Sequence, residues 1–350
     1  MITIDELAKL AKVSKSTVSK ALNDRPDVSF ATKRKIQEIA MAQNFTPNAY
    51  GKSLRSKITK NIGVIFTREK RPLLNNPFFS RILEGIEAEL ALNSYNLVLN
   101  IIPESNANEL PRIIRERHVD GIILIGVFTD LFIEKIISEK IHVVQVDPKT
   151  DVADFSQVFI DNEHGAFLAV KYLIESGHRR IGFMAGDLKR LSFKQRLDGY
   201  FKALKHYGIE PDKSLVRSGG IDEGYAHVKS LLENEHPTAI FSANDLNALN
   251  GYNAVIDMNL KIPDDVSLVG FDDIWSARVA TPPLTTVRVY KEELGSIGVR
   301  TLLKTINGEI ANPVNTIVPV KLIERKSVRN INILNDEMNY PSGRDQLQQK

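Results

Sequence analysis

The sequence predicts a chain of two structural classes: a small all-α head followed by a two-lobed α/β core. Helical periodicity with capping residues fills residues 3–45, whereas apolar strands alternate with amphipathic helices from residue 61 onward. The charge changes at the same place. Residues 1–60 hold 12 Lys and Arg against 5 Asp and Glu, a surplus of +7, and the whole chain is only +3, so the rest is −4. This asymmetry indicates a polyanionic partner for the head alone.

The head is expected to contain three helices. Thr3 and Glu6 form a capping-box pattern before the first helix, and Ser14 and Ser29 are N-cap candidates for the second and third. The second helix, "KSTVSKALN", is rich in Ser, Thr and Lys on its outer face. Two short helices joined by a turn of three or four residues, with such a second helix, form the helix-turn-helix pattern.

The core is expected to contain parallel sheets with helices on both faces. The apolar segments "NIGVIF", "NLVLNII", "DGIILIGV" and "IHVVQV" are typical of buried strands, and helical segments separate most of them. The pattern restarts near residue 180 with "RRIGFMAG", "TAIFSAND" and "DVSLVGFDD". We therefore predict two similar α/β lobes.

Polar residues end several of these strands. They are Asp147, Asn244, Asp245, Asp272 and Asp273. Open parallel sheets bind ligands at the carboxyl ends of their strands, so these residues are candidates for a site between the lobes.

Composition excludes several classes of protein. The chain has no cysteine, which excludes disulfides, thiolate nucleophiles and cysteine-based zinc sites. No window approaches 18 uninterrupted apolar residues, and "MITIDELAKL" is amphipathic, so we expect neither a membrane span nor a secretory signal. The seven histidines show no metal-ligand spacing, and we expect no metal and no cofactor.

Several motifs in the same order resemble the lac repressor and purine repressor family of bacterial transcription regulators. They are "TIDELAKLAKVSKSTVSKALN", "FTPNAYGKSL", "NPFFSRILEGIE", "IDNEHGAFLAVKYLIESGHRRIG" and "DVSLVGFDDIWSARVATPPLTTV", and the resemblance covers about residues 2–328. It implies a dimeric DNA-binding repressor with a core similar to a periplasmic sugar-binding protein.

The resemblance also implies domain bounds. These are a helix-turn-helix domain at 1–46, a hinge helix or linker at 47–59, a core at 60–329 and a flexible tail at 330–350. Within the core, the first lobe is expected at about 60–160 plus 290–320, and the second at about 162–288 plus 321–329.

DNA-binding residues follow from the same motifs. Lys can donate to guanine, while Ser and Thr can serve bases or phosphates. The resemblance places base readers at Lys15, Ser16 and Lys20, residues facing phosphates at Ser14, Thr17, Ser19 and Asn23, and hinge contacts at Asn48, Leu54 and Arg55. For the segment taken alone, the residues favour a simpler interpretation, in which Ser14 is only an N-cap and the lysines form a solvated face.

The hinge segment carries a departure from the family. Leu54 matches the residue that wedges into the minor groove and bends the duplex. Gly51 stands where the family commonly has Ala, and glycine costs about 1 kcal/mol relative to Ala within a helix. We expect this segment to be helical only when it is paired on bent DNA.

Effector-binding residues are implied in the same way. They are Phe78, Phe79, Asp147, Ser192, Arg196, Ile221, Asn244, Asp272 and Trp275. An arginine with five donors and an acceptor-only carboxylate can together hold adjacent hydroxyls of a sugar. Phe79 could instead be a core residue, and Trp275 could pack under "TPPLTT".

We therefore expect a sequence-specific transcriptional regulator, a repressor of a carbohydrate-utilisation operon, whose affinity for DNA is controlled by a sugar-like effector. Its expected partners are pseudo-palindromic double-stranded operator DNA, the effector and a second copy of the chain. We expect a cytoplasmic protein associated with the bacterial nucleoid, with no catalytic residue.

Three alternatives stay open. A transport-type sugar-binding protein would have the same two lobes but no use for a basic head. A regulator could sense a nucleobase or a sugar phosphate instead of a sugar. An enzyme is also conceivable on such lobes, although no G-x-G-x-x-G, P-loop or G-x-S-x-G occurs.

Overall fold

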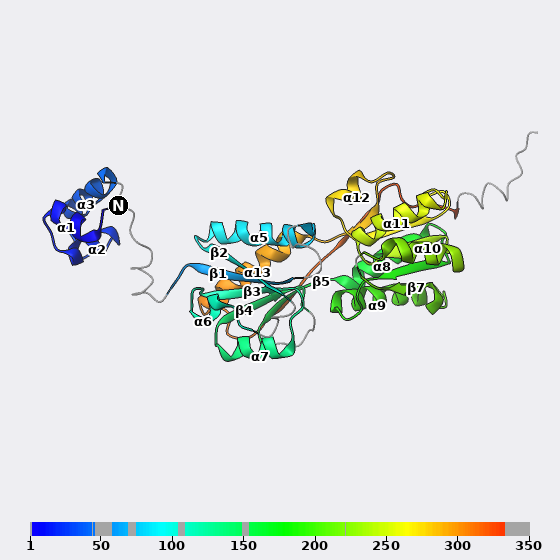
Figure 1. The fold of residues 1–350 in the computed structure, drawn as a ribbon, viewed down its shortest axis with the longest axis horizontal. Coiled ribbons are helices and arrows are strands. Elements are labelled where there is room, and N and C mark those ends of the chain that lie inside the picture. Colours follow the sequence, from blue (N-terminus) through cyan, green and yellow to red (C-terminus); the bar gives the residue numbers. More distant parts are fainter. Residues whose placement is uncertain are drawn as a thin grey trace, which may run out of the picture. The chain divides into compact units, whose positions relative to one another are not determined.

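The computed structural model describes residues 2–43, 45, 58–68, 75–103, 109–148, 154–220 and 222–332. Contacts divide the chain into two compact units, Met1–Thr59 and Lys60–Lys350. We call them the head and the core, and Figure 1 shows the elements of each.

The head contains three helices: α1 (Ile4–Ala11), α2 (Lys15–Leu22) and α3 (Phe30–Ala42). Thr3, Ser14 and Ser29 cap them, each accepting a hydrogen bond from a backbone N–H three residues later. The capping box of α1 is complete, because Glu6 N donates to Thr3 Oγ1 (3.3 Å) and Thr3 N donates to Glu6 Oε2 (2.7 Å). The predicted all-α helix-turn-helix head is confirmed.

The three helices pack around one apolar cluster. Its buried members are Leu7, Ala8, Ala11, Val18, Ala21, Val28, Ile36 and Ala40. Val18 and Ala21 turn one face of α2 inward. The opposite face of α2 therefore carries its polar residues at the surface.

Each lobe of the core is built on a sheet. In the described part of the chain, the first sheet is parallel and six-stranded, in the order β11-β5-β4-β3-β1-β2. Its strands are β1 (Asn61–Arg68), β2 (Asn96–Pro103), β3 (Gly121–Ile125), β4 (His142–Val146), β5 (Ser156–Ile160) and β11 (Asn315–Val318).

The second sheet, also six-stranded over the described residues, has the order β12-β10-β9-β8-β6-β7. Its strands are β6 (Ile181–Ala185), β7 (Val216–Ser218), β8 (Ala239–Ser242), β9 (Ser267–Asp272), β10 (Thr285–Arg288) and β12 (Lys321–Ile323). All neighbours are parallel except β12, which pairs antiparallel with β10.

Helices cover both faces of each sheet. The first lobe has α5 (Phe79–Leu92), α6 (Arg112–Arg115), α7 (Asp130–Ser138) and α13 (Lys291–Ile306); the second has α8 (Asn162–Glu175), α9 (Leu191–His206), a 3₁₀ turn (Lys213–Leu215), α10 (Gly224–Asn234), α11 (Asp245–Asp257) and α12 (Trp275–Val279). Adjacent strand residues join different clusters: Val64 packs with α5 and α13, whereas Ile65 packs with α7. In the second lobe, Phe241 packs with α8 and α9, and Ile240 with α10 and α11. The predicted α/β class of the core is confirmed.

The helices α5 and α13 cross at very short range. A Cβ added to Gly85 would lie 2.0 Å from the carbonyl oxygen of Glu292, and one added to Gly295 would lie 2.3 Å from that of Ile82. Only glycine fits at these two positions, so this crossing is closely packed.

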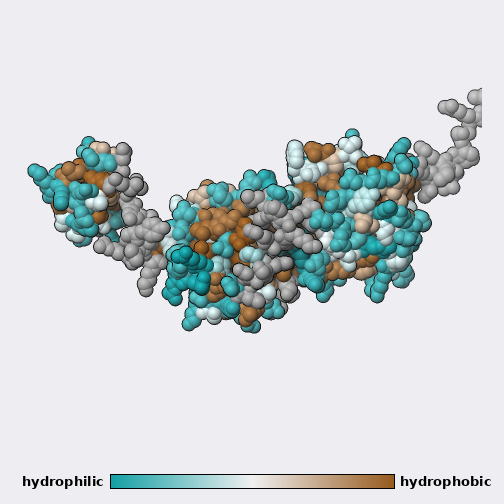
Figure 2. Space-filling model, in the orientation of Figure 1, coloured by the Kyte–Doolittle hydropathy of each residue, from teal (hydrophilic) through white to brown (hydrophobic). Residues whose placement is uncertain are grey.

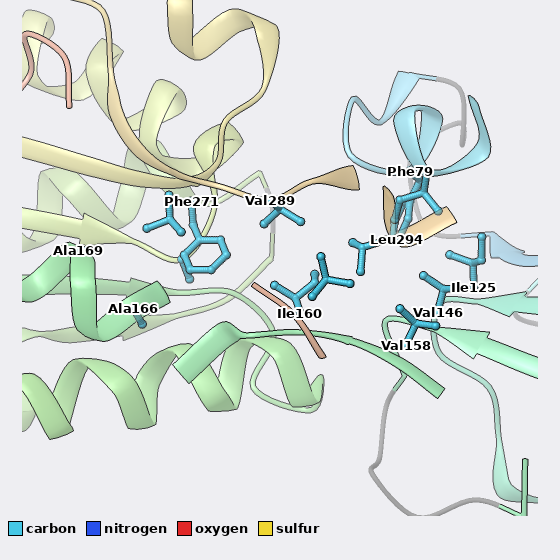
Figure 3. Packing of buried hydrophobic residues seen from close by; sticks show 14 of the residues in the cluster. Phe79, Ile125, Val146, Val158, Ile160, Ala166, Ala169, Phe271, Val289 and Leu294 are labelled. Atoms are coloured by element: carbon cyan, nitrogen blue, oxygen red, sulfur yellow. The ribbon is translucent and has the colours of Figure 1, made fainter. Parts of the chain in front are cut away.

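The lobes share a core as well as a chain. The chain passes between the sheets at residue 161, at residues 289–290 and at residues 319–320. One apolar cluster continues through this junction, where Ile160, Val289 and Leu294 lie between Phe271 of the second lobe and Val146 of the first (Figure 3). Movement of one lobe against the other therefore bends a continuous core.

Candidate functional site

A narrow cleft, with a cavity volume of about 50 Å³, lies where the two lobes meet near the ends of their strands. The first lobe contributes Asn76, Pro77, Phe78, Phe79 and Asp147, and the second contributes Arg190, Ser192, Phe193, Arg196, Asn244, Leu246, Asp272 and Ile274. Apolar side chains with a few convergent polar groups are typical of a small-molecule site.

Two buried polar atoms without a hydrogen bond belong to residues that line this cleft. They are Asn244 Nδ2 and Asp272 Oδ1, and the other three such atoms among the described residues belong to Gln157, His227 and Asn247, which do not line it. A larger hollow, of about 560 Å³, lies beside α8 and β11, but no atom of this kind lines it in the described chain. Buried polar groups cost stability unless a partner satisfies them, so the cleft is the better candidate for a ligand.

Arg196 of α9 is buried at the base of the cleft. Its Nε donates to Asn162 Oδ1 (2.9 Å), and its Nη1 donates to the carbonyl oxygen of Ala243. Its guanidinium also lies over the ring of Phe271, 3.7 Å from the centroid. Nη1 lies 3.4 Å from Asp272 Oδ1. Burial lowers the pKa of Arg196, while the charge of Asp272 opposes that shift. The guanidinium is therefore fixed before any ligand arrives.

Asp272 ends β9 with a φ of +112°, a backbone conformation that side chains rarely adopt. Burial raises the pKa of its carboxyl to about 6, although Arg196 and Lys291 favour the charged form. Near neutral pH the group is an acceptor-only carboxylate beside a fixed guanidinium. Together, these two groups offer acceptors and donors to adjacent hydroxyls.

Asn244 has two roles in one side chain. Its Oδ1 accepts from Asn247 N (2.8 Å) and so caps α11. Its Nδ2 is buried without a hydrogen bond. The cap orients the amide, which leaves the Nδ2 donor for a ligand.

Asp147 contributes a second carboxylate from the first lobe. It follows β4 with a φ of +52°, and its backbone N donates to the carbonyl oxygen of Val158 (3.0 Å). Its Oδ2 lies 3.5 Å from Nη2 of Arg190. This contact joins the two lobes across the cleft.

Aromatic rings form the apolar wall of the cleft. Phe78 and Phe79 meet edge to face at 5.3 Å, and Asn76 Oδ1 accepts from the N–H of Phe78 (3.0 Å), which fixes the loop before α5. Phe79 both lines the cleft and is buried in the core of the first lobe. The alternative that Phe79 is a core residue therefore holds as well. Arg190 lies over the rings of both Phe79 and Phe193.

The structure brings together most of the predicted effector residues. The residues at the cleft are Phe78, Phe79, Asp147, Ser192, Arg196, Asn244 and Asp272. Trp275 is not among the lining residues, because it begins α12 with its side chain 71% exposed. Ile221 lies outside the described residues.

Sequence reasoning missed Arg190 and Phe193 as lining residues. Both lie in the same short segment as Ser192 and Arg196, at the start of α9. Phe193 precedes Arg196 by three residues, a spacing that brings helical side chains together. This i, i+3 spacing from Arg196 is the feature of the sequence that could have predicted Phe193 as a lining residue.

The head presents the predicted DNA-binding residues on α2 and its caps. Ser14, Lys15, Ser16, Lys20 and Asn23 are exposed, and Thr17 and Ser19 are partly exposed. Ser14 is also the N-cap of α2, as its structural alternative predicts, because its Oγ accepts from Thr17 N (3.1 Å). Asn48, Leu54 and Arg55 lie outside the described residues.

Both candidate base-reading lysines make ion pairs at the surface. Lys15 Nζ lies 2.8 Å from Asp5 Oδ2, and Lys20 Nζ lies 2.5 Å from Asp27 Oδ2. All four side chains are at least half exposed. Exposed pairs contribute little to stability, so these lysines can exchange a carboxylate for a nucleic acid at small cost.

Comparison with known proteins agrees with both units. The family model of bacterial regulatory proteins, lacI family, matches residues 3–48, and that of a periplasmic binding protein-like domain matches residues 170–328. The ribose operon repressor of Haemophilus influenzae is 32% identical over 334 residues, which cover 94% of this chain and 99% of that protein. The chain belongs to the lacI family. It is therefore a DNA-binding transcriptional regulator and not an enzyme.

Solved structures of the lacI family match the whole architecture. The lac repressor dimer bound to operator and the anti-inducer ONPF has a TM-score of 0.83 at 26% identity, over 94% of this chain and 99% of that one. The complex of the regulator CelR with cellobiose has a TM-score of 0.73 at 29% identity, over 93% and 100%. The family acts as dimers on operator DNA. Among the described helices, none has the length and apolar character needed to cross a membrane.

Proposed function

We propose that this lacI-family member represses a carbohydrate-utilisation operon and that a small neutral sugar bound in the cleft controls its affinity for operator DNA. The observation that carries the proposal is the pairing of an unsatisfied donor, Asn244 Nδ2, with an unsatisfied acceptor, Asp272 Oδ1, next to the fixed guanidinium of Arg196. Hydroxyl groups both donate and accept, so a polyhydroxylated ligand meets all three demands.

The charges around the cleft favour a neutral ligand. Arg190 and Arg196 face Asp147 and Asp272, at 3.5 Å and 3.4 Å respectively. Because the two arginines are matched by two carboxylates, a sugar phosphate would meet repulsion as well as attraction. The rings of Phe78 and Phe79 offer apolar faces of the kind on which sugars lie. The cellobiose complex of CelR and the name of the ribose operon repressor support the same class of ligand.

We propose that Lys15, Ser16 and Lys20 contact the bases of the operator. The other polar residues of α2 and its caps contact phosphates: Ser14, Thr17, Ser19 and Asn23. The basic charge of residues 1–60 and the exposure of these side chains support the assignment. The hinge contacts of Asn48, Leu54 and Arg55, and the domain bounds expected from the sequence, remain part of this proposal. A regulator of this kind works in the cytoplasm, at the nucleoid.

Control of DNA binding follows from the shared core. A ligand that contacts both lobes favours one orientation of the lobes over another, and it shifts the balance only by its difference in affinity for the two. In a dimer, that orientation sets the spacing of the chain segments that lead to the two heads. A gel shift with and without the sugar shows whether the ligand releases the protein from operator DNA or tightens its binding.

The test begins with a thermal-shift screen of neutral sugars, sugar phosphates and nucleobases on purified wild-type protein. A neutral sugar is expected to raise the melting temperature by mass action. Arg196→Ala is expected to abolish that shift, whereas an exposed control variant, Lys304→Met, keeps it. Stabilisation by a nucleobase or a sugar phosphate alone would overturn the ligand class.

The second half of the test is a gel shift on DNA from upstream of the protein's own gene. The same sugar is expected to change operator affinity of the wild-type protein but not that of Arg196→Ala. If that variant binds sugar and responds to it like the wild type, the cleft is not the effector site.

A further inference from the structure

The turn that carries Asp272 is held in an unfavourable backbone conformation. Asp272 has a φ of +112° and Asp273 a φ of +52°, two consecutive residues with side chains in a region that favours glycine. Such conformations persist only where the surroundings fix them, and they gather at functional sites. The question is which group fixes this turn.

The side chain of Asp273 is occupied on the far side of the turn. Its Oδ2 accepts from Arg288 Nε (2.6 Å), its Oδ1 accepts from Arg325 Nη2 (2.5 Å), and Arg278 lies 3.3 Å away. All three arginines belong to the second lobe or its edge. They anchor the side chain, but they do not contact the backbone carbonyls of the turn.

Lys291 contacts those carbonyls. It is the first residue of α13, in the first lobe, and it is only 5% exposed. Its Nζ donates to the carbonyl oxygens of Asp272, Asp273 (3.4 Å) and Val289 (3.2 Å). An ammonium has three N–H donors, so all three of its hydrogen bonds are made to the turn and to the segment that passes between the lobes.

The charges around this ammonium explain why a cation can be buried there. Burial lowers the pKa of Lys291, and the negative charges of Asp272, Asp245, Glu292 and Asp273 oppose that shift. In return, the positive charge of Lys291 lowers the pKa of Asp272, second only to the guanidinium of Arg196 among the groups that do so. The ammonium and the effector-binding carboxylate are therefore electrostatically coupled.

We infer that Lys291 is a positioning residue for effector binding: its ammonium holds the 272–273 turn so that the Asp272 carboxylate faces the cleft, and it ties that carboxylate to α13 of the opposite lobe. This inference rests on the proposed function of the cleft as a sugar site. It adds a link between the ligand and the lobe junction, because the same Nζ holds Val289 at the passage into α13.

The direct test replaces Lys291 with Met, which keeps most of the length of the side chain and removes its donors and charge. D-ribose and the other neutral monosaccharides of the thermal-shift panel are the probes, and binding is measured by isothermal titration calorimetry. Lys291→Met is expected to weaken sugar binding by about tenfold or more, since an unfixed carboxylate also becomes easier to protonate. Lys304→Met, on the exposed side of the same helix, is expected to bind like the wild type. Equal affinity for Lys291→Met and the wild type would overturn the inference.

If Lys291→Met does not fold, Lys291→Gln takes its place in the titration. Gln keeps two N–H donors but carries no charge. Circular dichroism decides which variant is folded at the temperature of the titration. Lys291→Gln is expected to bind sugar more weakly than the wild type, and unchanged binding by a folded Lys291→Gln would equally overturn the inference.

A measurement without ligand separates this inference from the proposed function. The carboxyl carbon of Asp272 is titrated by NMR in the wild type and in the folded variant. The pKa of Asp272 is expected to rise when Lys291 loses its charge, together with shifts of the amide signals of residues 272–274. A loss of general stability would move neither at a temperature where the protein is folded. If the wild type binds no sugar, the ligand class fails while this titration still decides the role of Lys291; an unchanged pKa and unchanged amide signals refute it.

Discussion

Asn244→Ser separates the two roles of a single side chain. Serine is about as good an N-cap as asparagine, so the hydrogen bond to Asn247 N is replaced and α11 keeps its start. We expect the free energy of unfolding to change by no more than about 0.5 kcal/mol. The Nδ2 donor, which is buried without a hydrogen bond, is lost.

The expected cost to sugar binding follows from that donor. A neutral hydrogen bond contributes about 0.5–1.5 kcal/mol net, so the dissociation constant should rise about two- to tenfold. Asn244→Ala is the matched variant: it loses the donor and the cap together, and it should lose about 1 kcal/mol of stability in addition. Thr129→Ala removes the N-cap of α7 at a residue that does not line the cleft, and it should lower stability without changing sugar affinity.

Two assays give the result. Urea denaturation followed by circular dichroism measures stability, and isothermal titration calorimetry with the sugar found in the thermal-shift screen measures affinity. Unchanged affinity in Asn244→Ser would show that Nδ2 does not reach the ligand. A loss of affinity in Thr129→Ala equal to that in Asn244→Ser would show that affinity follows stability, and the reasoning would fail.

Four further predictions concern pH, stability and DNA. Sugar affinity should be highest above pH 6 and fall as the pH drops through about 6, because protonated Asp272 is no longer an acceptor-only carboxylate; calorimetry from pH 5 to 8 checks this, and a flat profile contradicts it. Burial raises the pKa of Asp245 to about 8, so its contribution to stability is complete below its unfolded pKa and is lost as the pH rises through about 8. Asp245→Asn should flatten the dependence of melting temperature on pH between the unfolded pKa of Asp245 and about 8. An unchanged slope would contradict the raised pKa of Asp245. Lys20→Ala should weaken operator binding and reduce the slope of log affinity against log salt by about 1 if the side chain meets a phosphate, or relax specificity at one base pair if it reads a base; gel shifts at several salt concentrations distinguish these outcomes, and no change refutes both. Gly51→Ala should tighten operator binding, since alanine favours a helix by about 1 kcal/mol, and unchanged affinity would mean that helix formation in the hinge is not limiting.

Much of the fold could be predicted because local signals and tertiary structure agree. Thr3, Ser14 and Ser29 are helix caps in the sequence and in the structure. Most of the apolar runs that predict strands become inner strands of the two sheets, and β3 and β6 are buried along their whole length, as parallel strands usually are. The run "NLVLNII" is instead the edge strand β2 and is mostly not buried.

Part of the cleft could be predicted for a topological reason. Asp147 and Asn244 follow strands and Asp272 ends one, and the carboxyl ends of parallel strands come together at one edge of a sheet. Trp275 follows a strand end by only three residues, but the first turn of α12 carries it to the surface. A short distance in sequence from a strand end therefore does not place a side chain in the cleft.

Lys291 could not be predicted from the sequence at all. It reads as the first polar residue of an amphipathic helix, with no neighbour in the chain to indicate burial. Its partners are carbonyl groups of residues 272 and 273, in the other lobe, brought to it by the passage at residues 289–290. Backbone carbonyls leave no trace in a sequence, so only the fold reveals such a contact.

The order of strands in the two sheets also bears on how the protein is synthesised. Each sheet receives an edge strand from residues 315–323, through β11 and β12. A nascent chain therefore has a complete head after its first sixty residues, whereas neither lobe has its last strand until almost the whole core has left the ribosome. Until then, the edges of β5 and β10 stand unpaired, and such edges invite association with other chains. DNA-binding capacity thus precedes sensing during translation, and a chain that stops before residue 315 is expected to bind nucleic acid without regulation.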